Sequence, residues 1–317
     1  MVKNLIRSLA FLLIFVLLVL VISPIFDPKD NTTAAGIHDE QPNGFLAEPE
    51  DTIDVMFLGD SEGYSSFIPL QIWEEYGITS YFRGGGNQIL CKTYTYLQET
   101  FERQQPKLVI LETNAIYREF TVAEFLSHKL ESFAPVFEYH DRWKNLTAED
   151  FTKTPEYTNI VRDKGYSFHL EVKPRDTNFE IDMVEESEPV PAINQVYIRL
   201  MRDYCREQGA EFWLVAAPNA RNWSVYHHNG TSQLAQELGI PFLDLNMIPE
   251  EVPVDLKTDT YDGGEHLNYF GAVKATTYLS KQLWDTGLFE DKRSWPEYAP
   301  WNECLKDFRT ELEQKIS

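Results

Sequence analysis

The chain has 317 residues, which is enough for one large α/β domain together with a membrane anchor. Hydrophobic residues make up 43% of it, which predicts a packed core and excludes a wholly disordered chain. There are 28 Lys and Arg against 50 Asp and Glu, giving a net charge of −22. A field of that sign excludes nucleic acid as a partner, and it repels anionic polymers unless a local basic patch intervenes.

An apolar run without charges, Ser8 to Phe26, lies near the start of the chain. Its length of about 19 residues is close to what a hydrocarbon core requires. Lys3 and Arg7 precede the run and Asp27 follows it, so the positive-inside rule places the N-terminus in the cytoplasm and the body outside. We predict that residues 1–26 form a cytoplasmic tip and a single-pass anchor in the cell membrane. The alternative is a cleaved signal peptide.

The rest of the chain divides by composition and pattern. Residues 27–51 are rich in Pro, Gly, Asn and acidic residues, which predicts a solvated stalk. Residues 52–290 alternate strand-like and helix-like patterns, which predicts a three-layer α/β/α sandwich with about five parallel strands. The alternation stops at 117–190, which we expect to be an insertion that covers the carboxyl edge of the sheet as a lid. Residues 291–317 form a C-terminal extension with helical character.

Five strands are expected from short apolar runs bounded by turn residues. They are residues 53–58, a weaker run ending at 81, and residues 108–111, 212–216 and 241–245. In parallel sheets, functional sites form beyond the carboxyl ends of the strands, so residues that follow these runs are the first candidates.

Ser61 is the first candidate for a catalytic residue. It follows the first strand in the sequence Gly59-Asp60-Ser61, where a side chain is exposed at the mouth of the sheet. A serine at the tip of a strand can act as a nucleophile, with its own N–H directed into an oxyanion site. Taken alone, the three residues are equally typical of an ordinary turn.

His266 is the second candidate and lies just before the last expected helix of the domain. Asp262 precedes it by four residues in the stretch Asp262-Gly263-Gly264-Glu265-His266. A histidine and a nearby carboxylate are the base and the orienting acid that a serine nucleophile needs. The alternative interpretation is a polar loop before a helix that is capped by Asn268.

Together these motifs resemble the SGNH/GDSL hydrolase superfamily over about residues 52–285. The resemblance implies a flavodoxin-like sandwich that acts through Ser61, His266 and Asp262, without a cofactor. It also implies two oxyanion donors, Gly84 after the second strand and Asn114 after the third.

The match to the family departs from its usual pattern at two places. Glu112 stands where the family usually has glycine, and Asp262 lies four rather than three residues before His266. A bulge at Gly263 and Gly264 would keep the carboxylate within reach of the ring. Glu265 and Asp259 are the alternative acids.

Other residues gave weaker predictions. Arg142 and Trp143, within the insertion, are candidate substrate-binding residues, with a packed lid as the alternative. Three cysteines allow one disulfide and leave at least one free thiol. No spaced Cys/His cluster points to a metal site.

An anchored, extracytoplasmic hydrolase of this kind is expected to act on acylated glycan or another surface polymer. The resemblance extends loosely to exported members that modify surface polymers, including the D-alanyl transfer protein of teichoic acid, and favours O-acyl (mostly O-acetyl) hydrolysis or transfer. A second interpretation is a non-catalytic accessory protein that presents a polymer or partner to a membrane-bound acyltransferase. A lipase of the membrane surface is a third.

Overall fold

The computed structural model describes residues 2–177, 179, 181 and 184–316, and these fall into two compact units. One unit comprises residues 48–119 and 160–316, and the other comprises residues 2–47 and 120–159. We call them the sheet unit and the anchor unit, and we describe each by itself.

The sheet unit is built on five parallel strands in the order β2-β1-β3-β4-β5. Their bounds are β1 Val55–Gly59, β2 Ser80–Gly84, β3 Leu108–Glu112, β4 Glu211–Ala216 and β5 Phe242–Asp244. Every residue of β1, β2 and β3 is buried, as expected for strands covered on both faces. The predicted five-stranded parallel sheet is confirmed.

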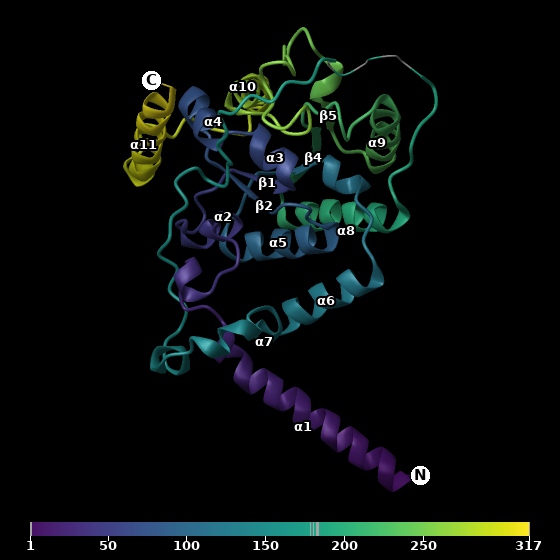
Figure 1. The fold of residues 1–317 in the computed structure, drawn as a ribbon, viewed down its shortest axis with the longest axis vertical. Coiled ribbons are helices and arrows are strands. Elements are labelled where there is room, and N and C mark those ends of the chain that lie inside the picture. Colours follow the sequence, from purple (N-terminus) through teal and green to yellow (C-terminus); the bar gives the residue numbers. More distant parts are fainter. Residues whose placement is uncertain (1, 178, 180, 182–183, 317) are drawn as a thin grey trace. The chain divides into compact units, whose positions relative to one another are not determined.

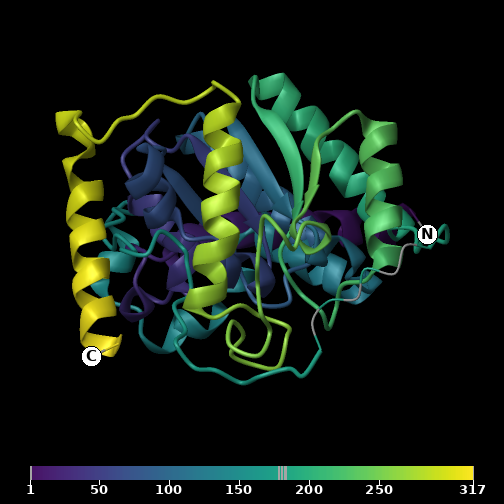
Figure 2. The ribbon, with the colours of Figure 1, turned by 90° about the horizontal axis from the view of Figure 1, so that it is seen from above.

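Helices cover both faces of the sheet. Figure 1 shows α5 and α8 together on one side, and α3, α4 and α10 on the other. The bounds are α3 Ser61–Ser66, α4 Pro69–Tyr76, α5 Leu90–Arg103, α8 Ala192–Gln208, α9 Val225–Leu238, α10 Tyr269–Asp285 and α11 Ala299–Ile316. Figure 2, seen from above, has α10 near its centre and α11 at its left edge. This is the predicted three-layer α/β/α sandwich.

The C-terminal extension is helical and packs on the sheet unit. Trp301 of α11 is buried and its ring centroid lies 5.5 Å from that of Trp73 of α4. Short 3-10 helices complete the unit: η3 Asn114–Tyr117, η6 Leu245–Met247 and η7 Pro296–Tyr298. Cys91, Cys205 and Cys304 are buried and form no disulfide with one another.

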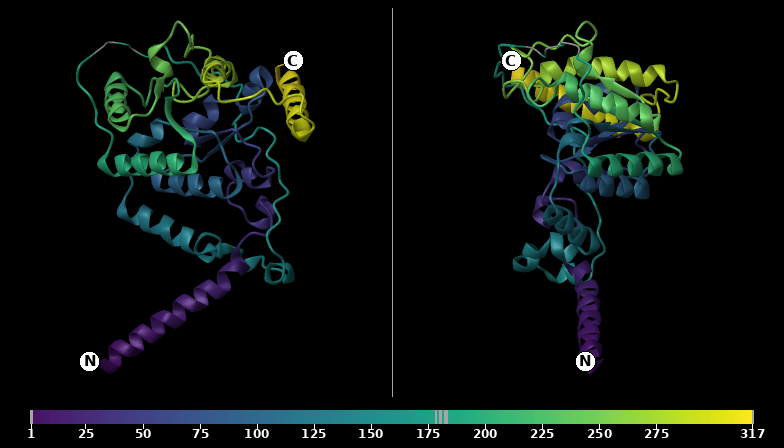
Figure 3. Two further views of the ribbon diagram at one scale, coloured as in Figure 1. Left: turned by 180° about the vertical axis from the view of Figure 1, so that it is seen from behind. Right: turned by 90° about the vertical axis from the view of Figure 1, so that its right-hand side faces the viewer.

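The anchor unit contains α1 Val2–Phe26, which is long and apolar enough to cross a membrane or to serve as a signal sequence. Figure 3 shows α1 as one continuous helix. The other elements of the unit are α2 Glu40–Asn43, α6 Val122–Phe133, α7 Pro135–Glu138, η1 Thr33–Ala35, η2 Gly44–Ala47, η4 His140–Lys144 and η5 Ala148–Phe151.

The predicted solvated stalk is not what the structure shows. Most of residues 27–51 lies in the anchor unit, where Phe45 and Asn31 are fully buried. The side-chain amide of Asn31 donates to the backbone oxygens of Asn43 and Asn159, at 2.9 and 2.8 Å. The polar composition therefore reflects a segment whose polar groups are satisfied inside a folded unit, rather than by solvent.

The predicted insertion 117–190 is also divided. Residues 120–159 belong to the anchor unit, whereas residues 160–175 run along the sheet unit. Lys164 O accepts from Phe82 N of β2 at 2.9 Å, and Ser167 N donates to Tyr64 O of α3 at 2.8 Å. The later part of the insertion therefore lies against elements that carry the candidate site. That residues 117–190 act as a lid stays a prediction.

Candidate active site

Ser61 is placed by the end of β1 and the start of α3. The side chain of Asp60 caps this helix and accepts from Glu62 N at 3.3 Å, so the chain turns into the helix at Ser61. The Ser61 side chain is half-buried, and its Oγ donates to Oε2 of Glu62 at 3.3 Å. A serine at the mouth of the sheet was predicted, but its contact with Glu62 was not.

His266 and Asp262 meet in the loop before α10. Nδ1 of His266 is hydrogen-bonded to Oδ2 of Asp262, and Asp262 Oδ1 accepts from His266 N at 2.9 Å. Gly263 and Gly264 have φ of 91° and 96°, a region that glycine enters at little cost. They form the bulge that brings a carboxylate four residues away onto the ring.

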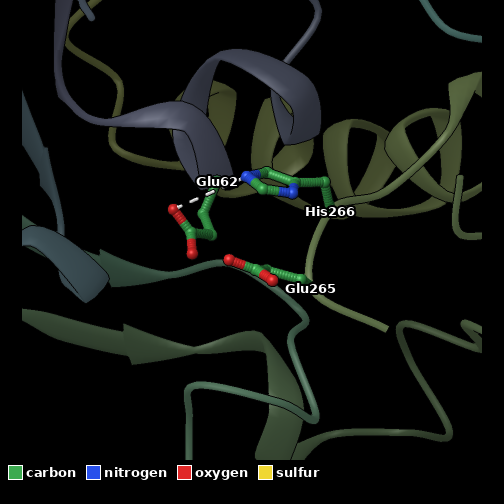
Figure 4. Close-up of side chains that lie close together, drawn as sticks. All are labelled: Glu62, Glu265 and His266. Carbon is green, nitrogen blue, oxygen red and sulfur yellow. Dashed lines mark ion pairs between the residues drawn. The ribbon is translucent and has the colours of Figure 1, made fainter. Parts of the chain in front are cut away.

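The other ring nitrogen of His266 is directed at the nucleophile loop. Nε2 is buried, lacks a hydrogen-bond partner among the described residues, and lies 3.9 Å from Oε2 of Glu62. Figure 4 shows Glu62 and His266 pointing toward one another. Since Ser61 Oγ contacts the same oxygen at 3.3 Å, that oxygen lies close to both the candidate nucleophile and the candidate base.

Glu62 is held by a second pair of side chains from the loop after β4. Asn222 Nδ2 donates to Glu62 Oε1 at 3.1 Å and to Glu265 Oε1 at 3.0 Å, and Asn219 Nδ2 lies 3.4 Å from the same Glu62 oxygen. Asn222 thus connects the nucleophile loop with the histidine loop. Arg221 pairs with Glu265 at 3.3 Å.

Three buried carboxyl groups, those of Asp60, Glu62 and Glu112, lie near the carboxyl ends of β1 and β3. Their pKa values are shifted in different directions. Burial, and then the charge of Glu62, raise the pKa of Asp60 well above its usual value. Burial also opposes ionisation of Glu62, but a hydrogen bond from Asp60 and the charge of His266 outweigh it and lower the pKa of Glu62. Burial and the charge of Glu62 raise the pKa of Glu112 to about 8. Of the three, Glu62 is the one whose ionised form the surroundings favour.

Asp262 is ionised as well. Its partial burial raises its pKa, but the hydrogen bonds from the side chain and backbone of His266 have the larger combined effect and lower it. An ionised carboxylate beside Nδ1 keeps the proton of the ring on that nitrogen, so Nε2, which lies toward Glu62, can accept a proton as a general base must.

The two predicted oxyanion donors follow the strands on either side of β1. Gly84 ends β2 in register with Gly59, and a Cβ at Gly84 would collide with the Gly59 carbonyl oxygen, so no other residue fits. Asn114 opens η3 after β3, and its Nδ2 lies 3.5 Å from Asp60 Oδ2. Their role as donors stays a prediction. Glu112, the departure from the family pattern, accepts from Asn114 N at 3.0 Å and so helps to place it.

Arg142 and Trp143, the predicted substrate-binding residues, lie in the anchor unit. Arg142 donates to the backbone oxygen of Phe26 at 2.7 Å and to Asp150 at 2.6 Å, so its guanidinium serves to hold the end of α1. Trp143 is exposed. Substrate binding by these residues stays a prediction.

Oxygen and nitrogen atoms of Glu62, Glu265 and His266 lie within 4.8 Å of one another, close enough for one divalent cation (Figure 4). The side-chain amide of Asn222 already donates to one oxygen of each glutamate. Both glutamates also lie near the imidazole of His266, which is the candidate base. We assign no metal to this group.

No family model and no curated protein matches the sequence. Among solved structures, a protein from Bacteroides fragilis described as an acylhydrolase is 14% identical, covers 79% of this chain and 97% of its own, and has a TM-score of 0.41. A GDSL-like lipase from Bacteroides thetaiotaomicron is 13% identical, and the match covers 78% of this chain and 100% of the lipase, with a TM-score of 0.38. The psychrotrophic esterase EstA from Pseudoalteromonas is 10% identical, and the match covers 74% of this chain and 100% of the esterase, with a TM-score of 0.39. The chemistry inferred below rests on the residues of the site.

Proposed function

We propose that this protein is a serine ester hydrolase or O-acyltransferase of the SGNH/GDSL type. The observation that supports this most is the arrangement around one oxygen: Glu62 Oε2 lies 3.3 Å from Ser61 Oγ and 3.9 Å from His266 Nε2, while Asp262 fixes the opposite nitrogen of the ring. Ser61, His266 and Asp262 would then be the nucleophile, the base and the orienting acid that acyl transfer needs.

The proposed reaction proceeds in two steps. Ser61 Oγ attacks the ester carbonyl carbon while its proton passes to His266 Nε2, and the resulting oxyanion is held by the backbone N–H groups of Ser61 and Gly84 and by the amide of Asn114. The alcohol leaves with the proton from His266, and an acyl-serine remains. Water or a sugar hydroxyl then attacks the acyl-serine and gives up its proton to His266, which passes it to Ser61 Oγ as the acyl–Oγ bond breaks and the free acid or the new ester leaves.

The proposed setting is the outer face of a cell membrane, with α1 as an uncleaved anchor and an acylated glycan or surface polymer as substrate. The apolarity of α1 from Ser8 onward, and the basic residues Lys3 and Arg7 in its first two turns, support this topology. The transferred group is proposed to be a short acyl group such as acetyl, on the basis of the family resemblance.

A panel of p-nitrophenyl esters of increasing chain length tests the proposal on the full-length protein in detergent. We expect turnover of the short-chain esters by the wild type and background rates in Ser61→Ala at equal folded concentration. Wild-type rates equal to those of Ser61→Ala would reject the enzyme and favour the accessory protein that presents a polymer to an acyltransferase.

A further inference from the structure

The guanidinium of Arg118 lies beside Asp60, the residue that precedes Ser61. Its terminal nitrogen is 3.6 Å from Asp60 Oδ2, which is longer than a hydrogen bond. Its Nε is buried without an acceptor in the described part of the chain. Arginine carries five N–H donors, so this side chain has capacity for another acceptor.

The backbone of Arg118 is held in place by hydrogen bonds from α8. Asn194, fully buried on α8, donates from Nδ2 to the backbone oxygens of Ile116 at 2.7 Å and Arg118 at 2.9 Å. The neighbouring Tyr117 hydroxyl donates to His227 O at 2.8 Å. A ligand that bound this guanidinium would therefore not have to order the loop that carries it, which lowers the entropic cost of binding.

Asp60 is a weak ionic partner for Arg118. Burial and the charge of Glu62 raise the pKa of the Asp60 carboxyl well above its usual value, which disfavours its ionised form, and the two groups are 3.6 Å apart. Oδ2 of Asp60 is also approached by Asn114 Nδ2 at 3.5 Å. Arg118 and Asn114 thus approach the same oxygen of Asp60, the residue before Ser61, and one third of the Arg118 side chain is open to solvent.

We propose that Arg118 binds an anionic group, a carboxylate or a phosphate, on the alcohol part of the ester, and so selects acylated anionic polymers as substrates. The inference rests on the ester chemistry proposed above and names the class of substrate for the same site. A planar guanidinium pairs with carboxylate and phosphate through two parallel hydrogen bonds. A chain with a net charge of −22 repels polyanions unless a cation lies at the site, and Arg118 provides that positive charge.

Three acetate esters that differ in charge on the alcohol part test the proposal: phenyl acetate, 4-acetoxybenzoate and 4-acetoxyphenyl phosphate. The full-length wild type, Arg118→Gln, Arg118→Lys and Arg199→Gln are compared at one ionic strength. Arg199 on α8 is a matched control, because its side chain is similarly exposed (41% against 33%) and its loss changes the net charge equally.

We expect Arg118→Gln to lower kcat/KM for an anionic ester, relative to phenyl acetate, by about tenfold, or ~1.4 kcal/mol. Arg118→Lys should keep part of this preference because it keeps the charge, and Arg199→Gln should keep all of it. The anionic ester that loses more identifies the anion as carboxylate or phosphate. An unchanged ratio in Arg118→Gln, or the same loss in Arg199→Gln, would overturn the inference.

The inference and the proposed function fail in different ways. If the wild type does not hydrolyse phenyl acetate, the ester chemistry is rejected. The anion site is then tested by calorimetric titration of 4-hydroxybenzoate and of phenyl phosphate into wild type and Arg118→Gln. Binding of either anion that is at least several-fold tighter in the wild type supports the site, and equal or undetectable binding of both anions in the two proteins rejects it.

Discussion

The carboxylate of Glu62 faces the ring of His266, with Oε2 3.9 Å from Nε2. Glu62 is 2% exposed and ionised, so its negative charge acts on the ring with little screening by water. In the proposed reaction, this charge would stabilise the imidazolium that forms when His266 takes the proton of Ser61.

From this we predict that Glu62→Gln lowers kcat for a short-chain ester by on the order of tenfold to a hundredfold, because the positive charge on His266 loses its partner. Glu265→Gln is the matched control, since Glu265 is more exposed and paired with Arg221, and it should change kcat by less than about threefold. Steady-state kinetics of both variants decides the matter, and equal effects would argue against a specific role for Glu62.

The raised pKa of Glu112 predicts how the stability of the protein depends on pH. Its pKa is about 8 in the folded protein and 4.5 in the unfolded chain, so between these values the folded state binds more protons. Stability is then present in full below pH 4.5 and is lost as pH rises toward 8. Glu112→Gln removes this loss, and its free energy of unfolding should exceed that of the wild type at pH 8 by on the order of 4 kcal/mol.

Urea unfolding of wild type and Glu112→Gln at pH 5 and pH 8 is the measurement. The free energy of unfolding of Glu112→Gln should exceed that of the wild type by more at pH 8 than at pH 5. A difference that stays constant with pH would mean that the buried Glu112 carboxyl is not the group that titrates.

Gly84 and Gly86 form a matched pair for the close approach of β2 to β1. A Cβ at position 84 would collide with the Gly59 carbonyl oxygen, whereas at position 86 its nearest neighbour would be the Tyr64 hydroxyl at 3.9 Å. We predict that Gly84→Ala destabilises the protein by about 2 kcal/mol or more and lowers ester turnover, and that Gly86→Ala does neither. Thermal unfolding and turnover of both variants provide the comparison, and a tolerated Gly84→Ala would contradict the close approach of β2 to β1 at this position.

The anchor prediction is tested by fractionation of expressing cells. If α1 is an uncleaved anchor, the intact chain sediments with membranes and resists high-salt extraction, because an apolar helix is retained by the hydrocarbon core. Recovery of a mature protein that lacks residues 1–26 in the medium would show instead that α1 is a cleaved signal sequence.

The sheet could be predicted from the sequence because parallel strands are buried on both faces and appear as short apolar runs, such as Leu108–Leu111. The contact of Asp262 with His266 could be foreseen as well, since two successive glycines permit the bulge that the four-residue spacing requires. Both features depend on residues that are close together in the chain.

The features that were missed depend on residues far apart in the chain. Glu62 directly follows Ser61, but its position is fixed by Asn219 and Asn222 from the loop after β4. The supposed stalk is folded because the buried Asn31 bonds to Asn159, a partner that composition does not reveal. Local pattern finds elements and motifs, whereas tertiary hydrogen bonds decide which polar residues are buried.

The most direct test of the account is labelling of the full-length protein with a fluorophosphonate, followed by mass spectrometry of the peptides. We predict one adduct on Ser61 in the wild type, none in Ser61→Ala, labelling slowed by at least about a hundredfold in His266→Ala, and a smaller slowing in Asp262→Asn. Absence of an adduct on Ser61 in the wild type, or equal labelling of wild type and His266→Ala, would contradict an activated serine at this site.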